Sequence, residues 1–149
     1  MAPTTIKNVA LLYETGRRIN PLTDSSVALL FKNFKTLNEL SLEGNKISCH
    51  GGKIIAHNLQ QLTRLNLSKH SQIVGMNPIG NEGVYTVVQH LSNLVDLLVG
   101  KLHTYSGKCG LGWEGAAVIA RGLPDMEMLE IGSLIFDEDT NALGGRGFK

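Results

Sequence analysis

The chain has little of what marks the more specialised classes of protein. Its 149 residues include only two cysteines, Cys49 and Cys109, which is too few for a framework of disulfide bonds. Fourteen basic residues against thirteen acidic ones leave a net charge of +1, whereas a dedicated nucleic-acid-binding domain carries a basic excess. No stretch approaches the roughly 18–20 apolar residues that span a bilayer. We therefore expect neither nucleic acid nor a membrane as a partner.

The N-terminal segment also lacks the pattern of a secretory signal. It contains one lysine and only a brief apolar patch before Glu14, instead of a charged start followed by a long apolar run. We expect a soluble intracellular protein, with the cytoplasm as its location. The length predicts a single domain over residues 1–149.

What the chain does contain is a repeated pattern of aliphatic residues, L-x-x-L-x-L. Two copies are strict, and the others carry conservative apolar replacements. The copies are Ile6, Val9 and Leu11; Leu37, Leu40 and Leu42; Leu62, Leu65 and Leu67; Leu94, Leu97 and Val99; and Met126, Leu129 and Ile131. Repeats therefore start near residues 6, 37, 62, 94 and 126, and the last repeat is incomplete.

A second signature follows each copy, with Asn or Cys two positions before an aliphatic residue and a small residue four positions after it. The Asn or Cys positions are Asn20, Asn45, Asn77, Cys109 and Asn141, which are separated by 25, 32, 32 and 32 residues. The aliphatic residue always precedes the next L-x-x-L-x-L by fifteen residues. We expect the Asn or Cys side chains to turn inward and to bond the backbone of neighbouring turns, as a structural ladder.

Between these anchors the apolar residues recur with a helical period. They stand seven, eight and twelve positions after each aliphatic residue: Leu29, Leu30 and Phe34; Ile54, Ile55 and Leu59; Thr86, Val87 and Leu91; and Val118, Ile119 and Leu123, of which only Thr86 is polar. Each repeat is thus predicted to be a short strand, a turn and an amphipathic helix of about three turns. Neighbouring repeats must stack, because no single repeat can bury the apolar residues of its own strand and helix.

With these motifs the chain, from Ile6 to Gly147, resembles the leucine-rich-repeat superfamily, and its strand-plus-helix unit is similar to the ribonuclease-inhibitor-like subfamily. The resemblance implies an α/β right-handed solenoid, a horseshoe segment of about five repeats with parallel strands inside and helices outside. That subfamily includes enzyme inhibitors, sensor domains of immune receptors, actin-regulatory proteins and GTPase-activating proteins. For function the resemblance implies mainly the recognition of another protein.

The outward residues of the strands would form the concave face of such a solenoid, and they are mildly acidic. The candidate partner-binding residues on this face are Glu39, Ser41, Glu43, Arg64, Asn66, Asp96, Leu98, Met128 and Glu130. If this face binds, a basic or mixed surface is the best match. The alternative is that it serves only to keep the sheet soluble.

Six or seven extra residues enter every repeat but the second at one place, between the strand and the Asn or Cys turn. Insertions at equivalent positions project from one rim of a solenoid. The candidate partner-binding residues of this rim are Ile73, Val74, Leu102, His103, Tyr105, Ile135 and Phe136. Most are apolar or aromatic, so they either pack on one another as a satellite core or present a binding patch, and both can hold together.

Other motifs resemble cofactor-binding, metal-binding or catalytic sites, but a structural role explains them better. Gly110, Gly112 and Gly115 spell G-x-G-x-x-G, yet about ten residues separate them from the strand that ends near Val99, whereas a dinucleotide-binding motif follows its strand directly. The five histidines include no pair at the i, i+4 spacing, and Cys49, near a helix start, favours a thiolate only if it is exposed. We expect no cofactor, no metal and no catalytic residue, and hence no enzyme.

The predicted function is therefore non-catalytic recognition or assembly of another protein, whose identity the sequence leaves open. Both ends of the repeat array lack a capping element, so either the chain is cut from a longer array or subunits of a larger complex cover the ends. Two alternatives stay open. The chain is a ligand-sensing fragment of a larger receptor or regulator, or it is a GTPase-activating protein, for which Arg17, Arg18 or Arg64 is nominated only by residue type.

Overall fold

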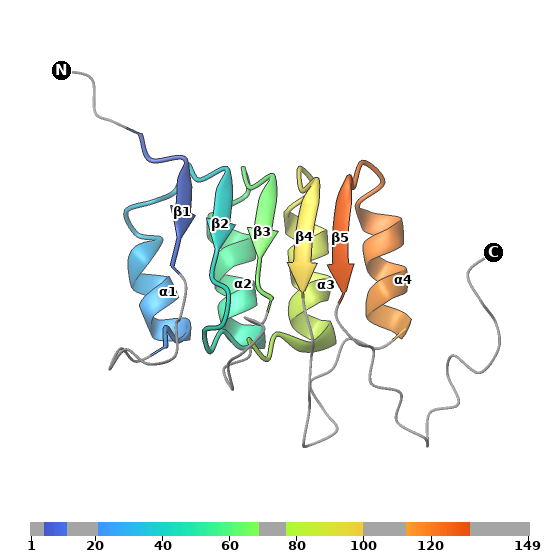
Figure 1. Cartoon of the computed structure of the whole chain (residues 1–149), viewed down its shortest axis with the longest axis horizontal. Helices are drawn as coiled ribbons and strands as arrows, with labels where there is room; N and C mark the ends of the chain where they lie inside the picture. The colour runs from blue at the N-terminus through green and yellow to red at the C-terminus, as the bar shows by residue number, and fades with distance from the viewer. Residues whose placement is uncertain (1–4, 12–20, 69–76, 100–112, 132–149) are drawn as a thin grey trace.

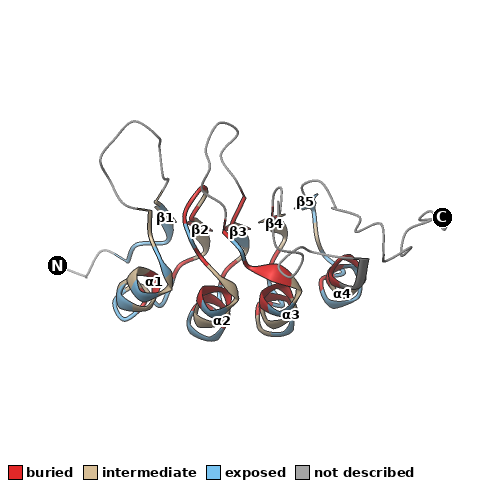
Figure 2. Cartoon of the chain, turned by 90° about the horizontal axis from the view of Figure 1, so that it is seen from below, coloured by how far each residue is buried: buried red, intermediate tan, exposed pale blue. Residues whose placement is uncertain are grey.

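A computed structural model describes residues 5–11, 21–68, 77–99 and 113–131 of the chain (Figure 1). Within these ranges it is an α/β structure with one five-stranded, all-parallel sheet, whose strands follow one another in chain order. The strands are β1 (Asn8–Ala10), β2 (Glu39–Ser41), β3 (Arg64–Asn66), β4 (Asp96–Val99) and β5 (Met128–Ile131). The helices are α1 (Asp24–Leu30), α2 (Cys49–Asn58), α3 (Gly80–His90) and α4 (Trp113–Gly122). The helices form a second layer against one face of the sheet (Figure 2).

The strand register follows the leucine pattern. Val9 pairs with Leu40, Leu40 with Leu65, Leu65 with Leu97 and Leu97 with Leu129, so the central aliphatic residue of every L-x-x-L-x-L lies in one row. Side chains along a strand alternate between its two faces, so this row points to one side. The prediction of five short parallel strands, each separated from the next by a helix, is confirmed.

The hydrophobic core lies between the sheet and the helices. Leu40, Leu65 and Leu97 are buried on the strand side, and Ile55 of α2 and Leu59, which follows α2, are buried opposite them. Each such side chain contributes about 1.5–3 kcal/mol relative to an exposed position. The core is continuous from α1 to α4, which agrees with neighbours that bury one another's apolar residues.

Of the three apolar residues predicted for the first helix, Leu30 and Phe34 pack against the core, but Leu29 does not. Leu29 is 65% exposed, whereas Val27 and Phe31 are buried in the core. Val27 and Phe31 stand four residues apart and therefore lie on the same helical face, while Leu29 is about 200° around the helix from Val27. The prediction for Leu29 is thus wrong. The helix of seven residues is also shorter than the expected three turns, which α2, α3 and α4 reach with ten, eleven and ten.

Glycine sets the close spacing between α2 and α3. A Cβ atom added to Gly83 would lie 2.5 Å from Ile79 Cγ1 and 3.3 Å from the Cα atom of Cys49. A Cβ atom added to Gly52 would lie 2.9 Å from Ile79 Cδ1. A larger residue at either position would force the two helices or the Ile79 side chain to move.

Two buried asparagines connect successive strands through their side chains. Asn45 Nδ2 donates to the carbonyl oxygens of Leu11 (2.7 Å) and Leu42 (3.0 Å), and its Oδ1 accepts from the backbone N–H of Leu22 (2.9 Å). The side chain of Asn45 therefore links backbone groups of two successive strand-to-helix connections. Buried polar groups need such partners, because an unpaired one costs about 1–3 kcal/mol.

Asn77 repeats this arrangement one strand further on. Its Nδ2 donates to the carbonyl oxygens of Leu42 (2.8 Å) and Leu67 (3.2 Å), and its Oδ1 accepts from the N–H of Ile47 (2.8 Å). Asn45 and Asn77 are each only 2% exposed, so water cannot replace these bonds. The other predicted ladder positions, Asn20, Cys109 and Asn141, lie outside the described residues.

Among the helices of the described ranges, none has the length and apolar character needed to cross a membrane.

Replacing Asn45 with Ala should lower the free energy of unfolding by about 3 kcal/mol, because three backbone groups lose their buried partner. Urea denaturation followed by circular dichroism measures this change. Asn58→Ala is the matched control, since the Asn58 side chain is exposed and bonds only the Ile54 carbonyl of its own helix. That control should change stability by no more than about 0.5 kcal/mol. Equal effects of the two substitutions would contradict a supporting role for the buried asparagine.

Candidate functional site

The face of the sheet that points away from the helices carries the candidate site, which we call the strand face. Its side chains are the alternate residues of each strand: Asn8, Ala10, Glu39, Ser41, Arg64, Asn66, Asp96, Leu98, Met128 and Glu130. A groove of ≈ 340 Å³ runs across it over β1 to β4. The groove exists because the L-x-x-L-x-L residues point to the core, so the outward positions are free to carry polar and small side chains.

An ion-paired row crosses the middle of the strand face. Arg64 on β3 pairs with Glu39 on β2 (Nη1 to Oε1, 2.9 Å) and with Asp96 on β4 (Nε to Oδ2, 2.8 Å). The three residues are register partners, so the parallel sheet holds them side by side. Arg64 is 54% exposed but Asp96 only 16%, which places the guanidinium above a partly buried carboxylate. The row therefore fixes the Arg64 side chain in one position at the centre of the groove.

A second row lies one step further along the strands and is less polar. Ala10, Ser41, Asn66, Leu98 and Glu130 form it, in strand order. Asn66 is fixed by its neighbours, because its Oδ1 accepts from the N–H (2.9 Å) and the hydroxyl (2.6 Å) of Ser68. The small side chains of Ala10 and Ser41 leave the groove open above β1 and β2.

Glu43 occupies a different place from its expected position on a strand. β2 ends at Ser41, and Glu43 lies in the turn that follows, where its Oε2 accepts a 3.5 Å hydrogen bond from Asn66 Nδ2. The chain turns there because Gly44 adopts a positive φ of 75°, which glycine accommodates without strain. Glu43 therefore borders the strand face at the end of β2.

The strand face has an excess of negative charge. Glu39, Asp96 and Glu130 stand on it with Glu43 at its border, against the single guanidinium of Arg64. Arg64 engages two of these four carboxylates. At the far strand, Met128 adds an exposed apolar side chain next to this acidic surface. The arrangement suits a ligand that brings positive charge and some apolar surface.

The predicted rim residues lie outside the described part of the chain. This holds for Ile73, Val74, Leu102, His103, Tyr105, Ile135 and Phe136. The rim hypothesis therefore stays a prediction, and the candidate site consists of the strand face alone.

The pKa of the Cys49 thiol is raised, whereas a helix start by itself favours a reactive thiolate. Burial raises the pKa of the Cys49 thiol, and the negative charge and hydrogen bond of Glu82 raise this pKa further, against a smaller opposing effect of Lys53. The thiol form is thus favoured at neutral pH, because two causes act against the anion. The helix start does not activate this cysteine.

Sequence analysis missed one pair of side chains. The imidazole rings of His57 on α2 and His90 on α3 lie against each other in a tilted arrangement, with their centroids 4.4 Å apart. A search for ligands at i, i+4 spacing within one helix could not find them, because they come from successive helices. In the described ranges no group of three or more metal-ligating side chains occurs.

The chain matches no protein-family model, and the curated proteins searched include no match to it.

Replacing Arg64 with Gln should lower the free energy of unfolding by about 0.5–1 kcal/mol at low salt, because Glu39 and Asp96 would lose the cation between them. The effect is small because Arg64 and Glu39 are more than one-third exposed. In about 1 M NaCl, where the Debye length is about 3 Å, most of this difference should disappear. Arg121→Gln, at an exposed position of α4, is the control. A loss that is equal at both salt concentrations would contradict an ionic origin.

Proposed function

We propose that the chain is a segment of a leucine-rich-repeat solenoid, and that it recognises another protein through the strand face without catalysing a reaction. The in-register strands, the single layer of helices and the buried asparagines support this assignment. In a solenoid each repeat contributes one strand to an extended surface, and such surfaces are used for binding.

The observation that carries the proposal is the Glu39–Arg64–Asp96 row inside the groove. Arginine residues held by neighbouring groups are frequent binding hot spots, because little side-chain entropy is lost when a partner contacts them. The guanidinium uses Nε and Nη1 for its two carboxylates. Both N–H groups of Nη2 and the second N–H of Nη1 remain to bond a carbonyl or carboxylate oxygen of a partner.

The charge of the strand face defines the class of partner. Glu43 and Glu130 both lie beyond the ion-paired row, towards the carboxyl ends of the strands, and pair with no basic residue of the described ranges. A partner with two lysine or arginine side chains, spaced to match the distance from the end of β2 to β5, would place a cation near each of these carboxylates. The partner is therefore a protein surface of basic or mixed character, and the complex is expected to weaken with rising salt.

Charge reversal on the strand face tests this function. The variant Glu43→Lys/Glu130→Lys leaves the Arg64 row intact and should lose a stoichiometric partner that the unchanged protein retains in affinity purification with quantitative mass spectrometry. Opposite charges attract a basic partner, and reversed charges repel it.

The matched control is Asp125→Lys/Glu127→Lys, which makes the same change of net charge at exposed positions before β5. This control should retain the partner. Equal recovery with all three proteins would show that the strand face is not the binding surface. Loss with the control alone would place the binding surface elsewhere.

A further inference from the structure

Two histidines meet at the ends of neighbouring helices. His57 stands in the last turn of α2 and His90 is the last residue of α3. Their ring centroids are 4.4 Å apart and the ring planes are tilted by 40°. His57 is exposed and His90 half-buried, so ions in solvent can reach the pair.

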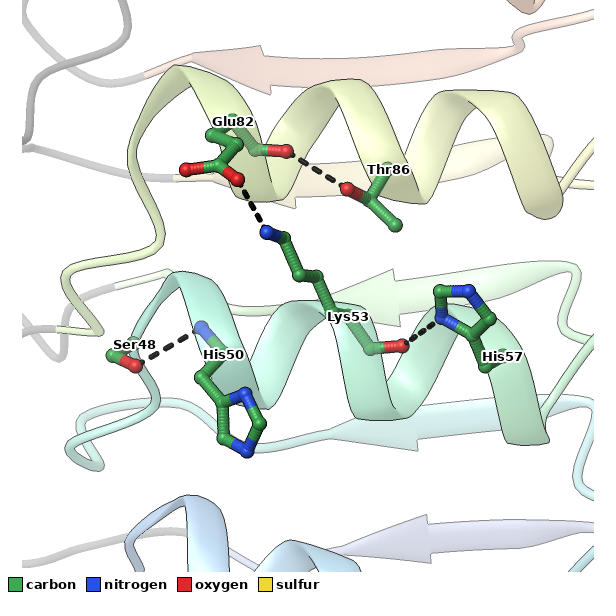
Figure 3. A network of polar contacts seen from close by, with 6 residues as sticks. All are labelled: Ser48, His50, Lys53, His57, Glu82 and Thr86. Atoms are coloured by element: carbon green, nitrogen blue, oxygen red, sulfur yellow. Dashed lines mark hydrogen bonds and ion pairs between the residues drawn. The ribbon is translucent and has the colours of Figure 1, made fainter.

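Both rings are oriented by their own helix. His57 Nδ1 lies 2.7 Å from the carbonyl oxygen of Lys53 (Figure 3), and His90 Nδ1 lies 2.9 Å from that of Thr86. A carbonyl oxygen can only accept, so each Nδ1 carries the proton and each neutral ring keeps the lone pair of Nε2 free. Histidines that bind metal ions have this arrangement, with one ring nitrogen bonded to a carbonyl and the other to the metal.

The spacing of the rings fits a shared ion of a particular geometry. An ion bonded to Nε2 at about 2.1 Å lies about 3.2 Å from the ring centroid. For two rings whose Nε2 atoms both face such an ion, a centroid separation of 4.4 Å corresponds to an angle of about 90° at the ion. Neighbouring ligands in square-planar or octahedral coordination make this angle, and Cu²⁺ and Ni²⁺ prefer those geometries. A tetrahedral Zn²⁺ site would hold the centroids about 5.2 Å apart.

The electrostatic surroundings favour a cation. The carbonyl ends of α2 and α3 carry the negative ends of two helix dipoles, and these ends lie side by side in the layer of helices (Figure 1). Lys53, one turn before His57, forms an ion pair with Glu82 on α3 (Figure 3), so its charge is largely compensated. The other basic residues at this end of the helix layer include Arg121 in the last turn of α4 and Lys32 and Lys35, which follow α1.

We propose that His57 and His90 together form a binding site for a divalent transition-metal ion of the Cu²⁺ or Ni²⁺ type, bonded through the two Nε2 atoms. No third His, Cys, Asp or Glu of the described residues joins them, so water completes the coordination and the ion exchanges with solvent. The site lies on the helix layer, away from the strand face, so it does not depend on the proposed recognition function.

Ni²⁺ is the probe for this site, in isothermal titration calorimetry with the full chain near neutral pH. The unchanged protein should bind Ni²⁺, and His57→Gln and His90→Gln should each weaken this binding at least tenfold, because even the loss of a supporting residue behind a metal ligand costs about 10–100-fold in affinity.

His50→Gln is the matched control, because His50 is an exposed histidine in the first turn of the same helix. It should leave the affinity for Ni²⁺ unchanged. Circular dichroism of all variants checks that the helices persist, so that weaker binding is not a consequence of unfolding. Unchanged Ni²⁺ affinity in either His57→Gln or His90→Gln would overturn the proposal, as would equal weakening by His50→Gln or no binding by the unchanged protein.

Discussion

The structure depends on the buried side-chain amides of Asn45 and Asn77. Parallel strands that follow one another in chain order require the chain to cross from each strand to a helix, and every crossing leaves backbone groups without partners in the sheet. Each asparagine bonds carbonyl groups of its own turn and of the preceding one, and accepts from an N–H between them. The amides therefore fix the distance and the register between successive strand–helix units.

That register creates both the strand face and the histidine pair. Because Glu39, Arg64 and Asp96 are register partners, one arginine can engage carboxylates on both neighbouring strands. The same spacing brings α2 and α3 together at Gly52 and Gly83, and their last turns then hold His57 against His90. Two surfaces of different chemistry thus arise on opposite layers from one repeated geometry. The strand face is acidic and polar, while the ends of α2 and α3 carry a pair of imidazole rings.

The period of the aliphatic residues was sufficient to predict the strands and their register, because burial of a leucine on one face leaves little freedom for a strand to slip. At α1 the same period gave a wrong prediction for Leu29. Val27 and Phe31 turn to the core instead, because several apolar residues close together allow more than one helical face. Sequence could identify the residues of the strand face but not their pairing, because the contact between Arg64 and Asp96 spans two strands that only the fold brings together. The contact between His57 and His90 could not be predicted for the same reason, because their separation of 33 residues matches no local ligand motif.

Native-state hydrogen exchange, measured by NMR, tests most directly whether the buried asparagines connect the strands. The N–H groups of Leu22 and Ile47 donate to the side-chain oxygens of Asn45 and Asn77 instead of to a neighbouring strand. We expect both amides to exchange as slowly as that of Leu42, which donates to the carbonyl of Asn66 in the sheet, because opening them requires separating successive units. Exchange of Leu22 and Ile47 at the rate of freely exposed turn amides would contradict the account.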